Sequence, residues 1–121
     1  MNILFKGTNY TITPEIESLC TSKITSATRM LGADQEKALT EVELELVEER
    51  KNNNAVYRAE VNVSLDGKLY RAESTRRSMQ NAISDVKKEL SNEIRRDRGK
   101  DKSLMKQGGR AVKSFLRGFG R

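Results

Sequence analysis

Histidine is absent from this 121-residue chain, and cysteine occurs once, at Cys20. The absence of histidine removes Ser–His and Cys–His nucleophilic sites, the most common general base and most zinc or iron sites. A single thiol cannot form an internal disulfide, and Cys20 lies at an apolar helical position, where a small core residue is expected. We therefore predict no catalytic residues, no metal and no other cofactor, and we predict that the protein is not an enzyme.

Long apolar runs are also missing. No stretch approaches the roughly 20 residues needed to span a bilayer, and residues 1–7 lack the basic and apolar regions of a signal peptide. We therefore expect a cytoplasmic protein with no membrane partner and no small-molecule substrate. With no tryptophan, three phenylalanines and three tyrosines, one modest core must be built mainly from aliphatic side chains.

Positive charge is concentrated toward the C-terminal end. The net charge is +6; residues 99–121 hold seven Lys or Arg and one acid, so residues 1–98 hold 16 charges of each sign. Residues 34–49 carry seven acids and one lysine (−6), whereas residues 68–98 carry nine bases and five acids (+4). This pattern predicts an acidic pole and a basic pole. Five of the eight glycines fall in residues 99–121, which predicts a flexible basic tail.

The spacing of apolar residues predicts six regular elements in the order βαβββα. Alternating apolar positions predict strands at residues 2–6, 40–48, 55–65 and 68–74. Apolar stripes at helical spacing predict helices at residues 14–31 and from a start within 75–78 to 98. Each strand has one apolar face and each helix one apolar stripe. Both helices should therefore cover the same face of a four-stranded sheet, giving an α/β (α+β) two-layer sandwich over residues 1–98.

Short motifs define several of the element ends. Thr13 can cap the first helix, and Pro14 suits its first position, where a missing N–H costs nothing. Gly32 is expected to end that helix. Asp66-Gly67 predicts a two-residue hairpin turn, which fixes the register of the last two strands.

The acidic pole includes the outward positions of the second predicted strand, Glu41, Glu43 and Glu45. We interpret this face as one that repels RNA and protects the sheet from edge pairing. A protein-interaction module could instead use it to bind a basic partner.

Basic residues of the second half of the chain are the candidate binding residues. We place Arg76 and Arg77 at the start of the last helix, where arginines are unfavourable unless they serve a purpose such as gripping a phosphate. A polar stripe then follows one side of the helix, at Ser84, Lys88, Ser91, Arg95, Arg98 and Lys102. Such a stripe can be a solvated face, but its continuation into a nearly acid-free tail favours a track for a nucleic-acid backbone.

The end of the tail carries Phe115, Leu116 and Phe119 at helical spacing among basic residues. These side chains could pack on the domain, insert into a membrane surface, or contact RNA or a ribosomal protein. The segment is short for stable membrane binding, so contact with RNA or protein is favoured.

Several motifs together resemble a known family. They are Asn2-Ile-Leu-Phe-Lys-Gly7-Thr-Asn9, Thr13-Pro14-Glu15-Ile16, Tyr57-Arg-Ala-Glu-Val-Asn-Val63, Gly67-Lys-Leu-Tyr-Arg-Ala-Glu73 and Ser78-Met79-x-x-Ala82-Ile83-x-x-Val86. In order and spacing they are similar to the ribosome hibernation-promoting factors, the family of ribosome-associated inhibitor A, once called sigma-54 modulation proteins. The resemblance covers residues 1–98.

The resemblance implies a βαβββα fold and a translation inhibitor that acts under stress. Such a protein binds the decoding region of the small ribosomal subunit, contacting rRNA and ribosomal proteins, and blocks the mRNA and tRNA sites. We expect it to be monomeric. A generic RNA-binding module, for double-stranded RNA or as an RNA chaperone, is the alternative.

The family pattern also suggests which residues bind rRNA. By position it implies Arg71, Lys87, Lys88, Arg95 and Arg96. Family members usually have acids where this chain has Arg76 and Arg77, so the resemblance does not support a role for these two arginines. We predict that they bind rRNA because of their charge, and for the same reason we add Arg98, Lys100 and Lys102.

The tail resembles that of the short form, which is associated with silencing single ribosomes and lacks a further C-terminal domain. We expect the tail to follow the mRNA channel through Lys106, Arg110, Lys113, Phe115, Arg117 and Phe119.

Overall fold

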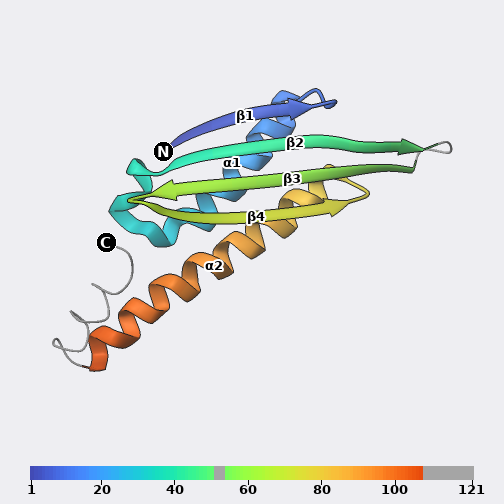
Figure 1. Cartoon of the computed structure of the whole chain (residues 1–121). Helices are drawn as coiled ribbons and strands as arrows, with labels where there is room; N and C mark the ends of the chain where they lie inside the picture. The colour runs from blue at the N-terminus through green and yellow to red at the C-terminus, as the bar shows by residue number, and fades with distance from the viewer. Residues whose placement is uncertain (51–53, 108–121) are drawn as a thin grey trace.

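Four strands form one mixed sheet in the order β1-β2-β3-β4 (Figure 1). The structure is a computed structural model that describes residues 1–50 and 54–107. The strands are β1 (Asn2–Thr8), β2 (Leu39–Arg50), β3 (Asn54–Leu65) and β4 (Lys68–Arg76). β1 pairs parallel with β2, and the other two pairings are antiparallel. The chain thus has the βαβββα order that the sequence predicts.

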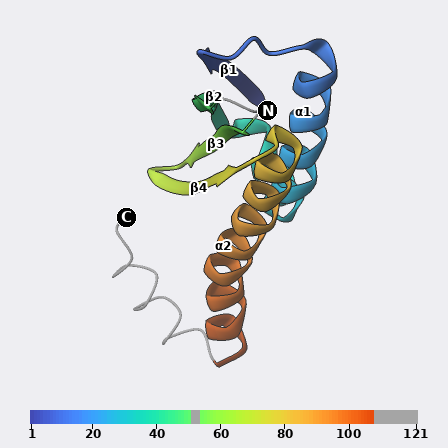
Figure 2. The same cartoon turned by 90° about the vertical axis from the view of Figure 1, so that its right-hand side faces the viewer.

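Both long helices cover the same face of this sheet (Figure 2). They are α1 (Pro14–Thr28) and α2 (Met79–Gln107), and a 3-10 segment, η1 (Arg29–Lys37), connects α1 to β2. The predicted two-layer α+β architecture is therefore confirmed.

The core lies between the sheet and the two helices. The predicted inner face of the hairpin is buried throughout, at Ala59, Val61, Val63, Tyr70 and Ala72. The apolar stripe of α2 is equally buried, at Met79, Ala82, Ile83, Val86, Leu90 and Ile94. Cys20 of α1 belongs to the same cluster, and burial raises the pKa of its thiol to about 12. It is a core residue, as expected.

The predicted cap and turn form as the sequence indicates. The Ile16 N–H donates to the Thr13 hydroxyl oxygen at 3.2 Å, and Pro14 begins α1. Asp66 and Gly67 have φ values of 50° and 79°, as a tight hairpin between twisted strands requires. This turn sets the confirmed register of β3 and β4.

The end of α1 differs from the prediction. The helix stops at Thr28 and not just before Gly32, which lies inside η1 with φ 61°. The Gln35 side-chain amide donates to the Thr25 carbonyl at 3.0 Å and to the Thr28 hydroxyl at 2.9 Å. The Thr28 hydroxyl also donates to the Ile24 carbonyl at 2.8 Å. The Gln35 amide thus gives the Thr25 carbonyl a partner, and the Arg29 N–H donates to the Ser26 carbonyl, so two of the last four carbonyls of α1 are satisfied without a glycine at the helix end.

The start of α2 also corrects the prediction. Arg76 is the last residue of β4, and Arg77 lies in the connection, so neither arginine begins the helix. The helix begins at Met79, and the Asn81 N–H donates to the Ser78 hydroxyl oxygen at 3.0 Å. A neutral serine cap therefore occupies the place where the sequence predicted an arginine pair.

The far end of α2 is longer than expected. The helix continues past Arg98 to Gln107, so residues 99–107 are helical and not part of a flexible tail. A glycine inside a helix costs only about 1 kcal/mol, which is why Gly99 does not end this one. The remaining predicted tail, 108–121, lies outside the described residues.

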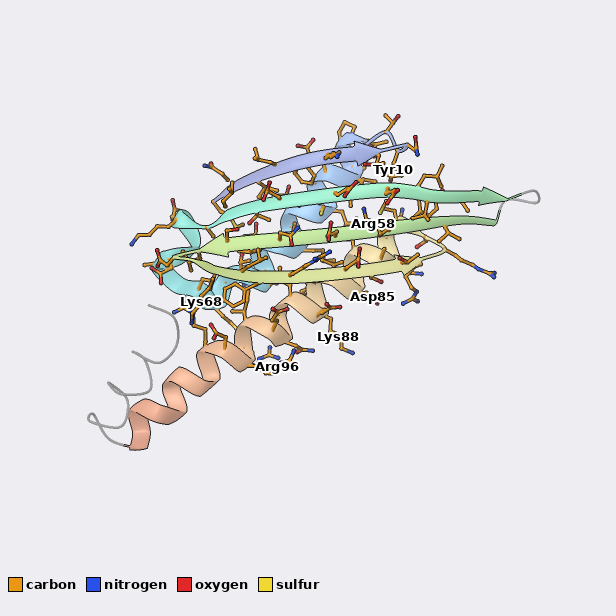
Figure 3. The ribbon with its side chains drawn as sticks, in the orientation of Figure 1. Tyr10, Arg58, Lys68, Asp85, Lys88 and Arg96 are labelled. Atoms are coloured by element: carbon orange, nitrogen blue, oxygen red, sulfur yellow. The ribbon has the colours of Figure 1, made fainter. Side chains whose placement is uncertain are left out.

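β2 lies between β1 and β3 and is not an edge strand, so the interpretation of its acidic face as protection against edge pairing is wrong. Its carboxylates surround Arg58 on the outer face, which is labelled in Figure 3. The guanidinium nitrogens lie 2.8 Å from Glu43, 2.7 Å from Glu45, 3.4 Å from Glu60 and 2.8 Å from Glu73. The acidic surface is therefore organised around a central cation.

Candidate nucleic-acid interface

A groove of about 470 Å³ between α1 and α2 is lined by basic and neutral side chains. Lys23 comes from α1, and the others come from α2: Ser84, Lys87, Lys88, Ser91, Asn92 and Arg95. No carboxylate is among the described residues that line it. Four cations therefore share one concave surface with hydrogen-bonding groups between them, an arrangement suited to a polyanion.

The packing of the two helices explains how these residues meet. On α2, Ser84, Lys88, Ser91 and Arg95 follow one another at steps of four, three and four, which places them on one side of the helix. The adjoining side carries the buried stripe that packs against α1. Lys23 lies next to the buried Ile24 and is brought to the same seam.

The groove cations are available for a ligand. Within the part of the chain that the structure describes, Lys23, Lys87, Lys88 and Arg95 make no salt bridge. The Arg95 guanidinium donates to the neutral Asn92 side-chain oxygen at 3.1 Å. Their charge is therefore not offset by a bonded carboxylate, and binding a phosphate would not require breaking an ion pair.

Two acids of α2, Asp85 and Asp97, lie on another side of the helix, where they contact β4. Asp85 accepts from Ser74 at 2.8 Å and from Arg76 at 2.7 Å. The hydrogen bond from Ser74, with that from Arg76, lowers the pKa of this carboxyl. This arrangement keeps Asp85 ionised and directed to the strand, away from the groove.

Asp97 forms a second contact of this kind. It accepts from the Tyr70 hydroxyl at 2.6 Å and from Lys68 at 3.1 Å. Burial acts to raise the pKa of Asp97, but the bonds from Tyr70 and Lys68 outweigh it, so the pKa is lowered. The pKa of the Tyr70 hydroxyl is raised, mainly by burial and also by its hydrogen bond to Asp97. The two contacts fix α2 against β4 and set which side of the helix is basic.

The structure separates the predicted rRNA-binding residues into groups. Lys87, Lys88 and Arg95 meet in the groove. Three others are paired with acids: Arg71 with Glu60, Arg76 with Asp85, and Arg98 with Asp34.

Arg71 lies on the outer face of the sheet, so the sheet separates it from the groove. Arg96 is exposed on α2 but does not line the groove. Figure 3 shows Arg96 and Lys88 on the side of α2 away from the strands in that view. Arg77 lines a separate hollow. The fold therefore does not bring all of the predicted residues together in one continuous binding surface.

The extension of α2 carries the remaining helical candidates. Lys100, Lys102 and Lys106 lie on it, and Lys106 is thus in a helix and not in an extended arm. The other predicted tail residues, Arg110, Lys113, Phe115, Arg117 and Phe119, lie outside the described residues.

Lys23 is the groove residue that sequence reasoning missed. It is the one basic residue in α1, and it directly precedes a core position of that helix. The sequence alone does not assign Lys23 to a basic site, because a single lysine becomes part of such a site only when a second helix packs beside it.

The described residues contain no group of three side chains suited to hold a metal ion. None of the described helices is long and apolar enough to cross a membrane.

The fold and groove define a small two-layer α+β protein with a basic interhelical surface. The chain belongs to the family described as Sigma 54 modulation protein / S30EA ribosomal protein, which matches residues 3–102. This confirms the family resemblance seen in the sequence.

Two of the solved structures that resemble the chain have TM-scores above 0.6. The first, the Protein Y N-terminal domain of Thermus thermophilus, is 26% identical with a TM-score of 0.63, over 79% of this chain and 98% of that one. The second, a ribosomal subunit interface protein from Coxiella burnetii, is 15% identical with a TM-score of 0.64, over 82% of this chain and 99% of that one. At this identity the second likeness shows the fold alone. A comparison with curated proteins gives no match.

Proposed function

We propose that the protein is a cytoplasmic, monomeric and non-enzymatic ribosome hibernation factor. It binds the small-subunit decoding region through the groove between α1 and α2 and inhibits translation under stress. The observation that carries this proposal is the set of four groove cations that have no acid partner among the described residues, in a chain of the S30EA ribosomal protein family.

The inhibition needs no chemistry. Lysine and arginine side chains that replace the counterions of rRNA phosphates supply binding energy, and the folded domain fills space that mRNA and tRNA would otherwise occupy. Because the groove is built on two packed helices, the backbone positions that carry its cations are fixed relative to one another before binding. Such preorganisation reduces the entropy lost on binding.

The residues outside the groove have secondary roles in this proposal. Arg96 contacts rRNA beside the groove, and Lys100 and Lys102 extend the basic side of α2. Residues 99–107 add about 14 Å as a helix, at 1.5 Å per residue, about half of what an extended arm would reach. The predicted contacts of residues 108–121 with the mRNA channel stay a prediction, because these residues lie outside the described part of the chain.

The test compares two double variants that lose the same charge. Lys88→Ala/Arg95→Ala removes two groove cations, and Lys6→Ala/Lys37→Ala removes two exposed lysines outside the groove. On the counterion-release relation, two lost phosphate contacts weaken binding about 30-fold at 0.15 M salt. Sedimentation with purified small subunits should show this loss for the groove variant and little change for the control.

Equal losses in the two variants would show that net charge, and not the groove, determines binding. The alternative is a generic RNA-binding module, because the same groove would fit any phosphate backbone. It predicts that duplex RNA of matched length competes as well as unlabelled subunits do.

A further inference from the structure

A second hollow, of about 340 Å³, lies where the loop after β1, the start of α1, the start of β3 and the start of α2 meet. Its lining differs in kind from that of the groove. Two aromatic side chains, Tyr10 and Tyr57, stand beside the buried apolar Met79, with Arg77 and Gln80 as polar neighbours. No carboxylate lies among the described residues that line it. A partly apolar, partly aromatic hollow with a few polar groups is the usual form of a site for a flat organic ring.

The backbone positions Tyr10 by two special conformations. A Cβ at Gly7 would collide with the Tyr10 carbonyl oxygen, so only glycine lets the loop fold this closely. Asn9 adopts a φ of 52°, a left-handed conformation that asparagine tolerates better than most residues. The loop therefore brings Tyr10, which is labelled in Figure 3, to the position from which its ring contacts Tyr57.

The two tyrosines form an edge-to-face pair. Their ring centroids are 5.8 Å apart and the rings are 78° from parallel. Both side chains are half-buried, so each keeps some surface open to solvent. In this geometry the face of one ring meets the edge of the other, and the faces are not stacked on each other. An aromatic ligand can therefore still stack here.

The hollow and the groove follow the same seam between the helices. Gln80 of the hollow and Ser84 of the groove are one helical turn apart on α2. Ile16 of the hollow and Lys23 of the groove are two turns apart on α1. A polyanion that lies along the groove toward the start of α2 would thus arrive at the tyrosine pair.

We propose that this hollow binds one unstacked base of a single-stranded RNA segment whose backbone lies in the groove, with Arg77 near the adjoining phosphate. The inference rests on the proposed function, since it assumes that the groove holds RNA. Stacking on tyrosine is tolerant of base identity, so the site would favour single strands without reading a particular sequence. A duplex cannot use it, because its bases remain paired and stacked.

The experiment uses the full chain and short single-stranded RNAs that carry one 2-aminopurine at successive positions, at low salt. Emission of this base falls when it stacks on an aromatic ring. The variants are Tyr57→Leu, which removes the ring and keeps apolar volume, and Tyr57→Phe, which keeps the ring. Circular dichroism checks that each is folded.

The wild type and Tyr57→Phe should quench the emission, and Tyr57→Leu should lose the quenching and bind about tenfold more weakly. The same RNA annealed to its complement should bind without this difference between variants. Equal quenching by Tyr57→Leu and the wild type, or no binding of single-stranded RNA by the wild type, would overturn the proposal.

These failures are distinct from failure of the proposed function, which subunit sedimentation decides. Loss of sedimentation by Lys88→Ala/Arg95→Ala with unchanged quenching in Tyr57→Leu would reject the hollow and keep the groove. If Tyr57→Leu does not fold, the proposal is tested by the change in the intrinsic tyrosine emission of the wild type when RNA binds. Tyr70 is buried against Asp97, so an RNA-dependent change must come from Tyr10 or Tyr57. Unchanged emission on RNA binding would reject the proposal.

Discussion

Replacing Arg58 with methionine would remove the cation at the centre of the outer sheet face and keep much of its aliphatic volume. Four glutamates lie within 3.4 Å of this guanidinium, and its side chain is 19% exposed. Without it, the carboxylates of β2, β3 and β4 would face one another with little compensation. We therefore expect Arg58→Met to be one of the most destabilising substitutions on the outer face.

The magnitude follows from the burial of this network. Exposed ion pairs contribute about 0.2–1 kcal/mol, and breaking a fully buried pair costs about 3–5 kcal/mol. The Arg58 network lies between these cases, so the free energy of unfolding should fall by about 2–3 kcal/mol. Arg71→Met is the matched control, because Arg71 contacts one glutamate and its side chain is 58% exposed. It should cost less than about 1 kcal/mol.

The cost of Arg58→Met should also depend on pH. Hydrogen bonds from Thr8 and then from Arg58 lower the pKa of Glu43. A carboxyl whose pKa is lowered on folding adds stability above its unfolded pKa and loses it as the pH falls through the folded value. In the variant, protonation instead relieves repulsion among the glutamates. The difference between wild type and variant should therefore shrink as the pH falls from 7 to below about 4.

Urea unfolding followed by circular dichroism measures both effects without adding salt. A loss for Arg58→Met no larger than that for Arg71→Met would refute this reasoning. A pH-independent difference would show that lost packing, and not charge, accounts for the effect.

Three further predictions concern the helices. Thr13→Ala removes the cap of α1 and should lower the free energy of unfolding by about 1 kcal/mol in urea titrations, whereas Thr13→Ser should be nearly neutral. Asp97→Asn removes the charge that accepts from Tyr70 and Lys68, and should cost about 1–2 kcal/mol at pH 7. That cost should shrink in acid. Because folding lowers the pKa of Asp97, its carboxylate adds stability to the wild type that is lost as the pH falls through this pKa. A cost that persists at pH 2 would argue against a role for the Asp97 charge. Truncation after Arg98 should leave the thermal midpoint nearly unchanged, since the described buried residues all precede it; a large drop would mean that later residues pack on the domain.

Much of the fold could be predicted because its signals are local. Alternation along β3 and β4 identified their inner faces, and the Asp66-Gly67 turn fixed their register without reference to the rest of the chain. The helix ends were less predictable. The Thr25 carbonyl near the end of α1 accepts from Gln35, which lies on a following segment, and this contact exists only after the chain folds back. Gly32 was the stronger local signal and gave the wrong end.

Only part of the basic surface could be predicted, because the rest of it also depends on contacts between distant segments. Helical spacing groups Lys88 with Arg95, so those positions followed from the sequence. Which arginines are paired with acids depends on tertiary contacts, as with Arg98, whose partner Asp34 is 64 residues away. The role of Lys23 likewise depends on α1 packing beside α2. Charge counts along the chain cannot distinguish a cation held by a neighbour from one that is available to RNA.

The most direct test of the central claim is the binding of the full chain to purified small ribosomal subunits that are either empty or preloaded with mRNA and tRNA. We predict saturable binding near one copy per empty subunit, with loss of most binding when the decoding region is occupied. Lys88→Ala/Arg95→Ala should bind empty subunits weakly, and Lys6→Ala/Lys37→Ala should bind them as wild type does. Equal binding to empty and preloaded subunits would contradict the proposed site on the ribosome.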